Sequence, residues 1–202
     1  MTKGRVEAFS DGVFAVAITL LVLDLRVPSP GGRSVAHQLA GQWPEYVAYG
    51  VSFLVIGIIW VNHHVLIGKL ARVDRPVLFL NLLLLFFVVL IPFPTAVVAQ
   101  HLRGTSWDAK VSVAFYNLVM EAMALAFSAI YAWAGRHHDL LDPAVDPARH
   151  VSALRQFGLG TVAYLPLVAV AFVSPVVAFA GDFVLAGFYV FDRTAASEGA
   201  VE

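Results

Sequence analysis

Six long apolar segments constrain the fold of this chain more than any other feature of its sequence. An α-helix needs about 20 apolar residues to cross the hydrocarbon core of a bilayer, and most of the segments reach that length. The segments run over residues 4–26, 44–68, 75–98, 108–135, 151–173 and 175–191. Turn-forming residues fill the breaks between them, as in the run Pro28-Ser29-Pro30-Gly31-Gly32. The sequence therefore predicts an all-α, polytopic membrane protein with six transmembrane helices.

Composition agrees with this fold class and excludes several functions. Hydrophobic residues make up 59% of the chain, its mean hydropathy is +0.78, and charged residues make up only 13%. That charged share is about half the usual one in soluble domains. Because the chain has no cysteine, disulfides and thiolate metal sites are excluded, and no basic patch supports binding to nucleic acid. We expect residues 1–193 to form a single six-helix transmembrane domain and residues 194–202 to form a short cytoplasmic tail.

The distribution of Lys and Arg predicts the orientation in the membrane. If both termini lie on one side, that side holds nine basic residues and the other holds four. The nine are Lys3, Arg5, Lys69, Arg72, Arg75, Arg136, Arg149, Arg155 and Arg193. The four are Arg26, Arg33, Arg103 and Lys110. Cytoplasmic loops are enriched in basic residues, so we expect both termini in the cytoplasm.

Polar residues of the first three segments fall at one depth in the predicted bundle. Successive segments cross in opposite directions, and a helix rises about 1.5 Å per residue, so residues about 10 Å from the cytoplasmic ends meet in one layer. These residues are Ser10, Asp11, Trp60, Asn62, His63, His64 and Asn81. Buried polar groups pair with one another and hold helices together, whereas ionisable groups inside a membrane often serve function. The layer is compatible with both roles, because locked helices can also position a pore.

The histidines and serine of this layer do not form a recognisable catalytic site. Adjacent residues point about 100° apart on a helix, so neither His63-His64 nor His137-His138 chelates a metal from one face. The metalloprotease sequence H-E-x-x-H is absent, and Ser10 is not part of a G-x-S-x-G elbow. We therefore predict no catalytic residue, no metal site and no enzymatic activity.

The first segment carries two stripes at helical spacing. Val16, Leu20 and Leu23 form a branched apolar stripe, with Thr19 beside it. A second stripe consists of small residues, which allow close helix packing: Ala8, Gly12, Ala15 and Thr19. Periodicity alone leaves two interpretations open, because a Val and Leu stripe faces either a pore or the surrounding lipid and core.

A resemblance to a known family favours the pore. The run Arg5-x-x-x-Phe9-Ser10-Asp11, followed by Gly-Val-Phe-Ala-Val-Ala-Ile-Thr-Leu-Leu-Val-Leu-Asp, resembles the signature of the transmembrane protein 175 family. Trp60-x-Asn62-His63-His64 and Asn81 fit its prokaryotic members. The resemblance implies a potassium-permeable channel with one six-span repeat, assembled as a homotetramer in the plasma membrane of a prokaryote.

The same resemblance assigns roles to residues. It implies a pore lined by the first helix, with a hydrophobic constriction at Val16 and further lining by Thr19, Leu20 and Leu23. At the constriction this chain has valine where bulkier isoleucine or leucine is common. The remaining motif residues are implied to form a helix-packing network: Arg5, Phe9, Ser10, Asp11, Trp60, Asn62, His63, His64 and Asn81.

Two functional hypotheses therefore stand. The first is a potassium-permeable cation channel whose partners are its own copies and the lipid bilayer, with permeant potassium ions and no cofactor. The second is a carboxylate-based, proton-coupled transporter using Asp11, Glu121 or Asp182, because an intramembrane carboxylate is costly and rarely lacks a partner or a purpose.

Overall fold

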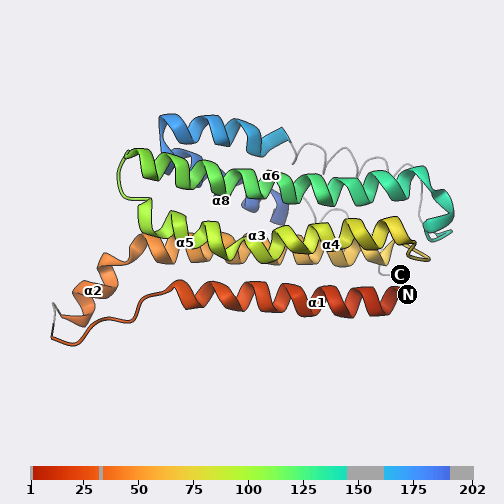
Figure 1. The fold of residues 1–202 in the computed structure, drawn as a ribbon, viewed down its shortest axis with the longest axis horizontal. Helices are drawn as coiled ribbons and strands as arrows, with labels where there is room; N and C mark the ends of the chain where they lie inside the picture. The colour runs from red at the N-terminus through yellow and green to blue at the C-terminus, as the bar shows by residue number, and fades with distance from the viewer. Residues whose placement is uncertain (1, 32–33, 145–161, 192–202) are drawn as a thin grey trace.

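The chain folds as a bundle of long helices (Figure 1). The computed structural model describes residues 2–31, 34–144 and 162–191, and these residues contain no β-strand. The helices are α1 (Lys3–Leu20), α2 (Val35–Gly41), α3 (Trp43–Gly68), α4 (Arg75–Leu90), α5 (Pro92–His101), α6 (Trp107–Arg136) and α8 (Pro175–Phe191). A further helix, Val162–Val173, precedes α8. Short 3-10 turns, η1 (Leu21–Asp24) and η2 (His138–Leu140), follow α1 and α6. The predicted all-α fold is confirmed.

The apolar helices match the predicted segments. Four stretches are long and apolar enough to cross a membrane, namely Lys3–Asp24, Trp43–Gly68, Arg75–His101 and Trp107–Arg136. Two shorter apolar helices follow in the last part of the chain. The first part of the predicted fifth segment, 151–161, lies outside the described residues, as does the predicted tail 194–202. The chain is therefore a multi-pass membrane protein.

The third predicted span is two helices rather than one. α4 ends at Leu90 and α5 begins at Pro92, with Ile91 between them. Proline lacks a backbone N–H and clashes with the preceding turn, but it fits the first turn of a new helix. The short helix α2 in the first loop was not predicted, because its seven residues follow no long apolar pattern.

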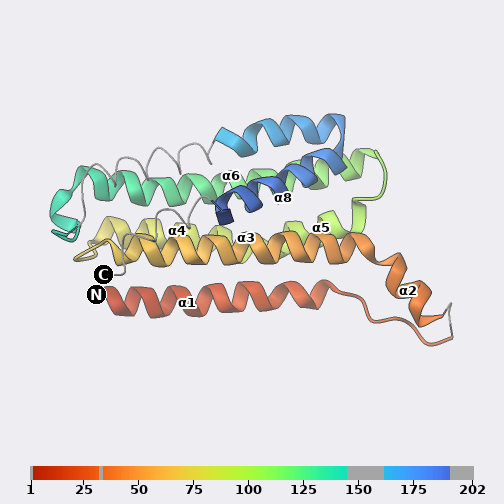
Figure 2. The same cartoon turned by 180° about the vertical axis from the view of Figure 1, so that it is seen from behind.

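Helix α1 lies along one margin of the bundle (Figures 1 and 2). It packs mainly on α3 and α4, while α6 and the last two helices lie on the far side of α3 and α4. Within its apolar stretch only 28% of the residues are buried, against 44–61% for the other three long stretches. A large part of the α1 surface therefore has no partner among the described residues of the subunit.

At the end of the bundle where α1 begins, side-chain contacts join the turn between α3 and α4 to the end of α6. The Asp74 side chain accepts from the backbone N–H of Val77 at 2.9 Å, which caps α4, and from Nε1 of Trp133 at 3.0 Å, which ties α4 to α6. Arg72 pairs with Asp139 beyond α6. These contacts fix the turn between α3 and α4 against the end of α6.

Candidate functional site

One face of α1 is buried against the bundle. Its members follow one another at spacings of three or four residues, so they share one side of the helix. They are Val6, Ser10, Phe14, Ala17 and Leu21. Because this stripe is fully used in packing on α3 and α4, the rotation of α1 about its own axis is fixed.

The opposite face of α1 is exposed and contains both predicted stripes. Val16 is 55% exposed, Leu20 38% and Leu23 74%. The small residues Ala8, Gly12 and Ala15 and the hydroxyl residue Thr19 are exposed beside them. We call this surface, formed by residues 8, 12, 15, 16, 19, 20 and 23, the open face of α1. It is a narrow, uncharged surface about 22 Å long at 1.5 Å per residue.

Thr19 places a hydroxyl oxygen on the open face. Its Oγ1 donates to the carbonyl oxygens of Ala15 and Val16, both at 2.9 Å. The single hydroxyl hydrogen is thereby held against the helix backbone, so the oxygen presents lone pairs rather than a donor to its surroundings. Such an oxygen can contact a cation or a water molecule.

A buried hydrogen-bonded chain links α1, α4 and α3. Ser10 Oγ donates to the carbonyl oxygen of Val6 at 2.8 Å and accepts from Nδ2 of Asn81 at 3.0 Å. Oδ1 of Asn81 then lies 2.7 Å from Nε2 of His63. Because an amide oxygen only accepts, this nitrogen of His63 carries the hydrogen. The ring of Phe14 packs on the His63 ring with centroids 5.4 Å apart.

A second row of polar pairs runs along a more exposed edge between α1 and α3. Nε1 of Trp60 donates to Oδ1 of Asp11 at 2.9 Å. One turn nearer the N-terminus, Nδ1 of His64 lies 3.0 Å from Oε1 of Glu7. Asp11 is only half-buried and its bonded partner is an indole. It thus holds α1 to α3 and does not belong to the open face.

Three predicted network residues lie away from these chains. Arg5 is exposed in the first turn of α1. Phe9 is 52% exposed and lines an apolar groove between α1 and α4 together with Leu82 and Phe86. Asn62 is buried but points away from α1, because it is one residue, or about 100°, from His63 on α3.

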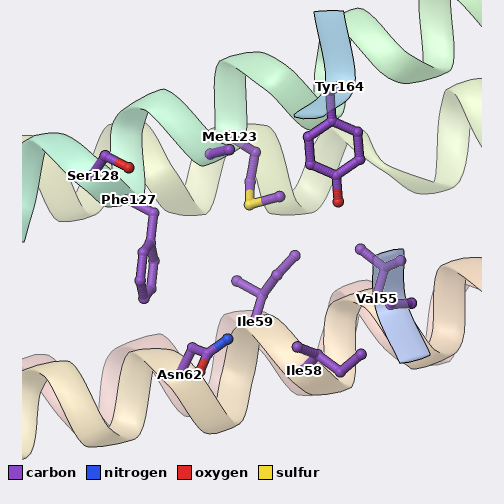
Figure 3. A pocket seen from close by; sticks show the side chains of 10 residues that line it. Val55, Ile58, Ile59, Asn62, Met123, Phe127, Ser128 and Tyr164 are labelled. Carbon is purple, nitrogen blue, oxygen red and sulfur yellow. The ribbon is translucent and has the colours of Figure 1, made fainter. Parts of the chain in front are cut away.

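Asn62 lines a small pocket in the interior of the subunit. The pocket has a volume of about 60 Å³ and lies between α3, α6 and the last two helices. Figure 3 shows Asn62 and Ile59 of α3 facing Met123 and Phe127 of α6, with the Tyr164 hydroxyl directed between them. The Asn62 Oδ1 atom is buried without a hydrogen-bond partner.

The structure also contains a polar cluster that the sequence did not predict. Ser52 of α3 lies 2.8 Å from the Thr95 hydroxyl and 3.1 Å from the Tyr116 hydroxyl. Asn117 follows Tyr116 on α6, and its Nδ2 donates to Oδ2 of Asp182 at 3.3 Å. Isolated hydroxyl residues in apolar helices form no recognisable sequence pattern. Counting the helical rise of about 1.5 Å per residue from the opposite ends of the helices would have placed these hydroxyl residues at one depth.

Metal-binding groups are not gathered in the described parts of the chain. No cluster of three or more His, Cys, Asp or Glu side chains occurs there with the spacing to hold a metal ion. What the arrangement offers is a fixed helix with an open, uncharged face and one outward hydroxyl oxygen. Such a surface suits the wall of an ion path rather than a site of covalent chemistry.

Comparison with known proteins gives consistent matches. Residues 5–92 match the family model described as the endosomal/lysosomal potassium channel TMEM175. The chain is 52% identical to a potassium channel of Streptomyces collinus over 95% of its own length and 93% of the relative. It is 37% identical to the endosomal/lysosomal proton channel TMEM175 of Danio rerio, over 52% of this chain and 22% of that one.

The fold is also similar to a solved structure. The crystal structure of a lysosomal potassium-selective channel TMEM175 homologue from Chamaesiphon minutus superposes with a TM-score of 0.85. Sequence identity is 34%, and the match covers 94% of this chain and 97% of that chain. The similarity therefore extends beyond the N-terminal motif to the whole bundle.

Proposed function

The chain belongs to the TMEM175 family, and we propose on that basis that it is a potassium channel whose ion path runs along the open face of α1. The observation that carries the proposal is the uneven burial of α1. Its buried stripe packs on α3 and α4, while the face with Val16, Thr19 and Leu23 is exposed and has no partner in the part of the subunit that the structure describes. One helix cannot enclose a path, so several copies are required, and we propose a homotetramer.

The constriction in this proposal is a ring of Val16 side chains. A hydrophobic ring gates by loss of water, and an ion that passes it must give up part of its hydration shell. Potassium holds its shell less tightly than sodium, so partial dehydration favours potassium. Leu20 and Leu23 continue the wall, and the Thr19 oxygen contacts the ion or its remaining water. Because valine is smaller than leucine or isoleucine, we expect a comparatively wide ring.

The buried chain of Ser10, Asn81 and His63 supports the pore in this proposal. It holds α1 at one rotation relative to α3 and α4. A turn of about 100°, one residue, would replace Val16 by Ala17 or Ala15 at the constriction. The motif residues near the N-terminus thus determine which side chains face the axis without contacting the ion themselves.

The remaining features of the proposal concern the whole chain. We propose a prokaryotic plasma-membrane protein with cytoplasmic termini, a single channel domain over residues 1–193 and a short tail over 194–202. Potassium ions are its cargo, and we propose neither a resident cofactor nor an enzymatic activity. The Lys and Arg distribution and the resemblance to bacterial potassium channels support this assignment.

Purified protein tests the proposal directly. We expect native mass spectrometry to give a tetramer and liposomes to release potassium down its gradient at channel rates. Single-channel steps should persist without a proton gradient. A monomer, or potassium flux that is absent from the reconstituted tetramer, would contradict the channel.

One observation favours a second function. Asp182 is a carboxyl group that is 1% exposed inside the bundle, and carboxyl groups in such positions serve proton-coupled transporters. Obligatory coupling of potassium movement to an opposing proton gradient would support this transporter and contradict the channel. We expect no such coupling, because Asp182 lies on α8, which is separated from the open face of α1 by α3 and α4.

A further inference from the structure

Asn117 and Asp182 form a buried polar pair that the proposed pore does not use. Asn117 lies on α6 and is fully buried, and Asp182 lies on α8 and is 1% exposed. Nδ2 of Asn117 donates to Oδ2 of Asp182 at 3.3 Å. The two helices are in contact, so the pair lies inside the subunit, away from the open face of α1.

Two buried acceptor oxygens of this pair have no hydrogen-bond donor. Nδ2 of Asn117 has two hydrogens, and they are directed to the carbonyl oxygen of Val113 and to Oδ2 of Asp182. Oδ1 of Asn117 and Oδ1 of Asp182 are both buried without a partner. Both atoms are acceptors when Asp182 is ionised. A hydrogen added to Oδ1 of Asp182 would convert one of these acceptors into a donor.

Within the described helices α6 and α8 and the helix before α8, no positive charge lies beside the pair. Residues 162–191 contain no Lys, Arg or His, so neither α8 nor the preceding helix supplies one. On α6, the basic residues Lys110 and Arg136 are seven and nineteen residues from Asn117, near the helix ends. An ionised carboxylate buried without a cation is strongly unfavourable, and in practice such a group takes up a proton.

The titratable groups that face Asp182 are acids. Tyr116 of α6 lies near Asp182, Tyr164 of the helix Val162–Val173 lies near Tyr116, and Glu121 lies one turn along α6 from Asn117. From α3 the nearby polar group is the Ser52 hydroxyl, bonded to Tyr116. None of these side chains supplies a positive charge.

The pocket described above provides room for water about one helical turn from Asp182 along α8. Ala186, one turn from Asp182 on α8, lines it, and Ala124 and Ser128 continue along α6 on the side of Asn117. Oδ1 of Asn62 and Oγ of Ser128 are buried beside it without partners. A volume of about 60 Å³ exceeds what one water molecule requires, and these oxygens can bind it (Figure 3).

We propose that Asp182 and Asn117 form a proton-binding site inside each subunit, remote from the α1 path, and that water in the neighbouring pocket supplies the proton. The proton is transferred from hydronium to Oδ1 of Asp182, leaving water and a neutral carboxyl group. Loss of this proton places an uncompensated negative charge between α6 and α8. The site therefore makes the packing of α8 dependent on pH.

Infrared spectroscopy of the full-length protein tests the protonated state. We expect the C=O stretch of a neutral carboxylic acid at neutral pH, reduced in Asp182→Asn and retained in the control Asp108→Asn, which replaces an exposed aspartate in the first turn of α6. Incorporation of isotope-labelled aspartate into the wild-type protein should shift this band, which identifies it even if the Asp182→Asn protein does not assemble. Absence of the band, or a band that labelled aspartate leaves unshifted, would overturn the proposal.

The pH dependence of thermal unfolding gives a second test. The folded state holds a proton that an exposed aspartate in the unfolded state releases, so stability should fall as pH rises from acid to neutral. Asp182→Asn mimics the neutral acid and should reduce this slope, whereas Asp108→Asn, at an exposed aspartate, should leave it unchanged. Equal slopes in wild type and Asp182→Asn would overturn the proposal. A melting temperature that rises with potassium only when Asp182 is present would do so too, because a bound cation would then occupy the site.

Discussion

Ser10 attaches the first helix to α4 by a buried side-chain hydrogen bond. Its hydroxyl donates to the Val6 carbonyl of its own helix and accepts from Asn81. Asn81 in turn contacts His63. Because Ser10, Asn81 and His63 are joined by successive hydrogen bonds, removing one side chain leaves a buried polar group of its neighbour without that bond.

Replacing Asn81 should therefore destabilise the protein more than replacing a neighbouring asparagine. Asn81→Ala leaves Nε2 of His63 without an acceptor and leaves Ser10 with only its bond to the Val6 carbonyl, and an unsatisfied buried group costs about 1–3 kcal/mol. Asn62→Ala is a matched control, because Oδ1 of Asn62 has no partner to lose. Thermal unfolding of the detergent-solubilised oligomer measures both changes. Equal destabilisation by the two substitutions would show that the Ser10–Asn81–His63 chain contributes nothing specific.

Val16 should control conduction through its size and polarity. Val16→Ala should raise single-channel conductance and weaken discrimination between potassium and sodium, since a wider ring removes less of the hydration shell. Val16→Asn should also raise conductance, because a polar ring lowers the barrier to wetting. Bilayer recordings of purified protein measure both, with Val22→Ala as a control that is exposed but lies outside the open face. Unchanged currents in both Val16 variants would place the constriction elsewhere.

Helix α1 as an element has two faces with different composition. The buried face contains Ser10, Phe14 and Leu21, and the open face contains small residues, valine, threonine and leucine. Its separation from the remaining helices is visible in Figures 1 and 2. The element thus combines a packing surface with an unpartnered surface along nearly its whole length.

Cysteine substitution separates the two faces experimentally. The chain contains no cysteine of its own, so each introduced thiol is unique. We expect cysteines at positions 16 and 23 to react with a water-soluble thiol reagent and to reduce potassium flux. Cysteines at positions 17 and 21, which are buried, should remain unreactive in the folded protein. Reaction at 17 and 21 but not at 16 and 23 would mean that α1 is rotated relative to this structure.

The sequence predicted depth more accurately than direction. The rise of a helix per residue is constant, so Ser10, His63 and Asn81 could be placed in one layer from spacing alone. Which way a side chain points depends on the neighbours of its helix. Asn62 is therefore predicted in the same layer and packing network as His63, and the structure places it at the interior pocket. Residues 75–98 are predicted as one segment, and the structure divides them at Ile91, because a proline in the sequence does not show whether a helix bends or ends there.

The ends of the whole molecule differ in charge. Lys3, Lys69, Arg72 and Arg136 lie at one end of the bundle, near the turn between α3 and α4. Lys3 donates to the carbonyl oxygen of Gly68 at 2.7 Å, which brings the start of α1 to the end of α3. The aromatic residues Trp43 and Trp107 are exposed at the opposite end, where such rings settle at a membrane–water interface.

This asymmetry predicts the orientation of the molecule in the cell. A fluorescent protein fused after residue 202 should fold and fluoresce, because we expect the C-terminus in the cytoplasm. Alkaline phosphatase fused at the same position should be inactive, and the same enzyme inserted in the loop after Pro30 should be active. The opposite pattern of activities would reverse the orientation.

The two faces of α1 share no residue, and this has an evolutionary consequence. A substitution at position 16, 19 or 23 would change the wall of the proposed path while the buried stripe of α1 stays unaltered. Descendants of such a protein can therefore acquire a different ion preference by a few point mutations while the requirements for folding and insertion stay satisfied. Variation among relatives should accordingly be tolerated on the open face, where it alters physiology, and purged from Ser10 and Phe14, where it would cost the fold.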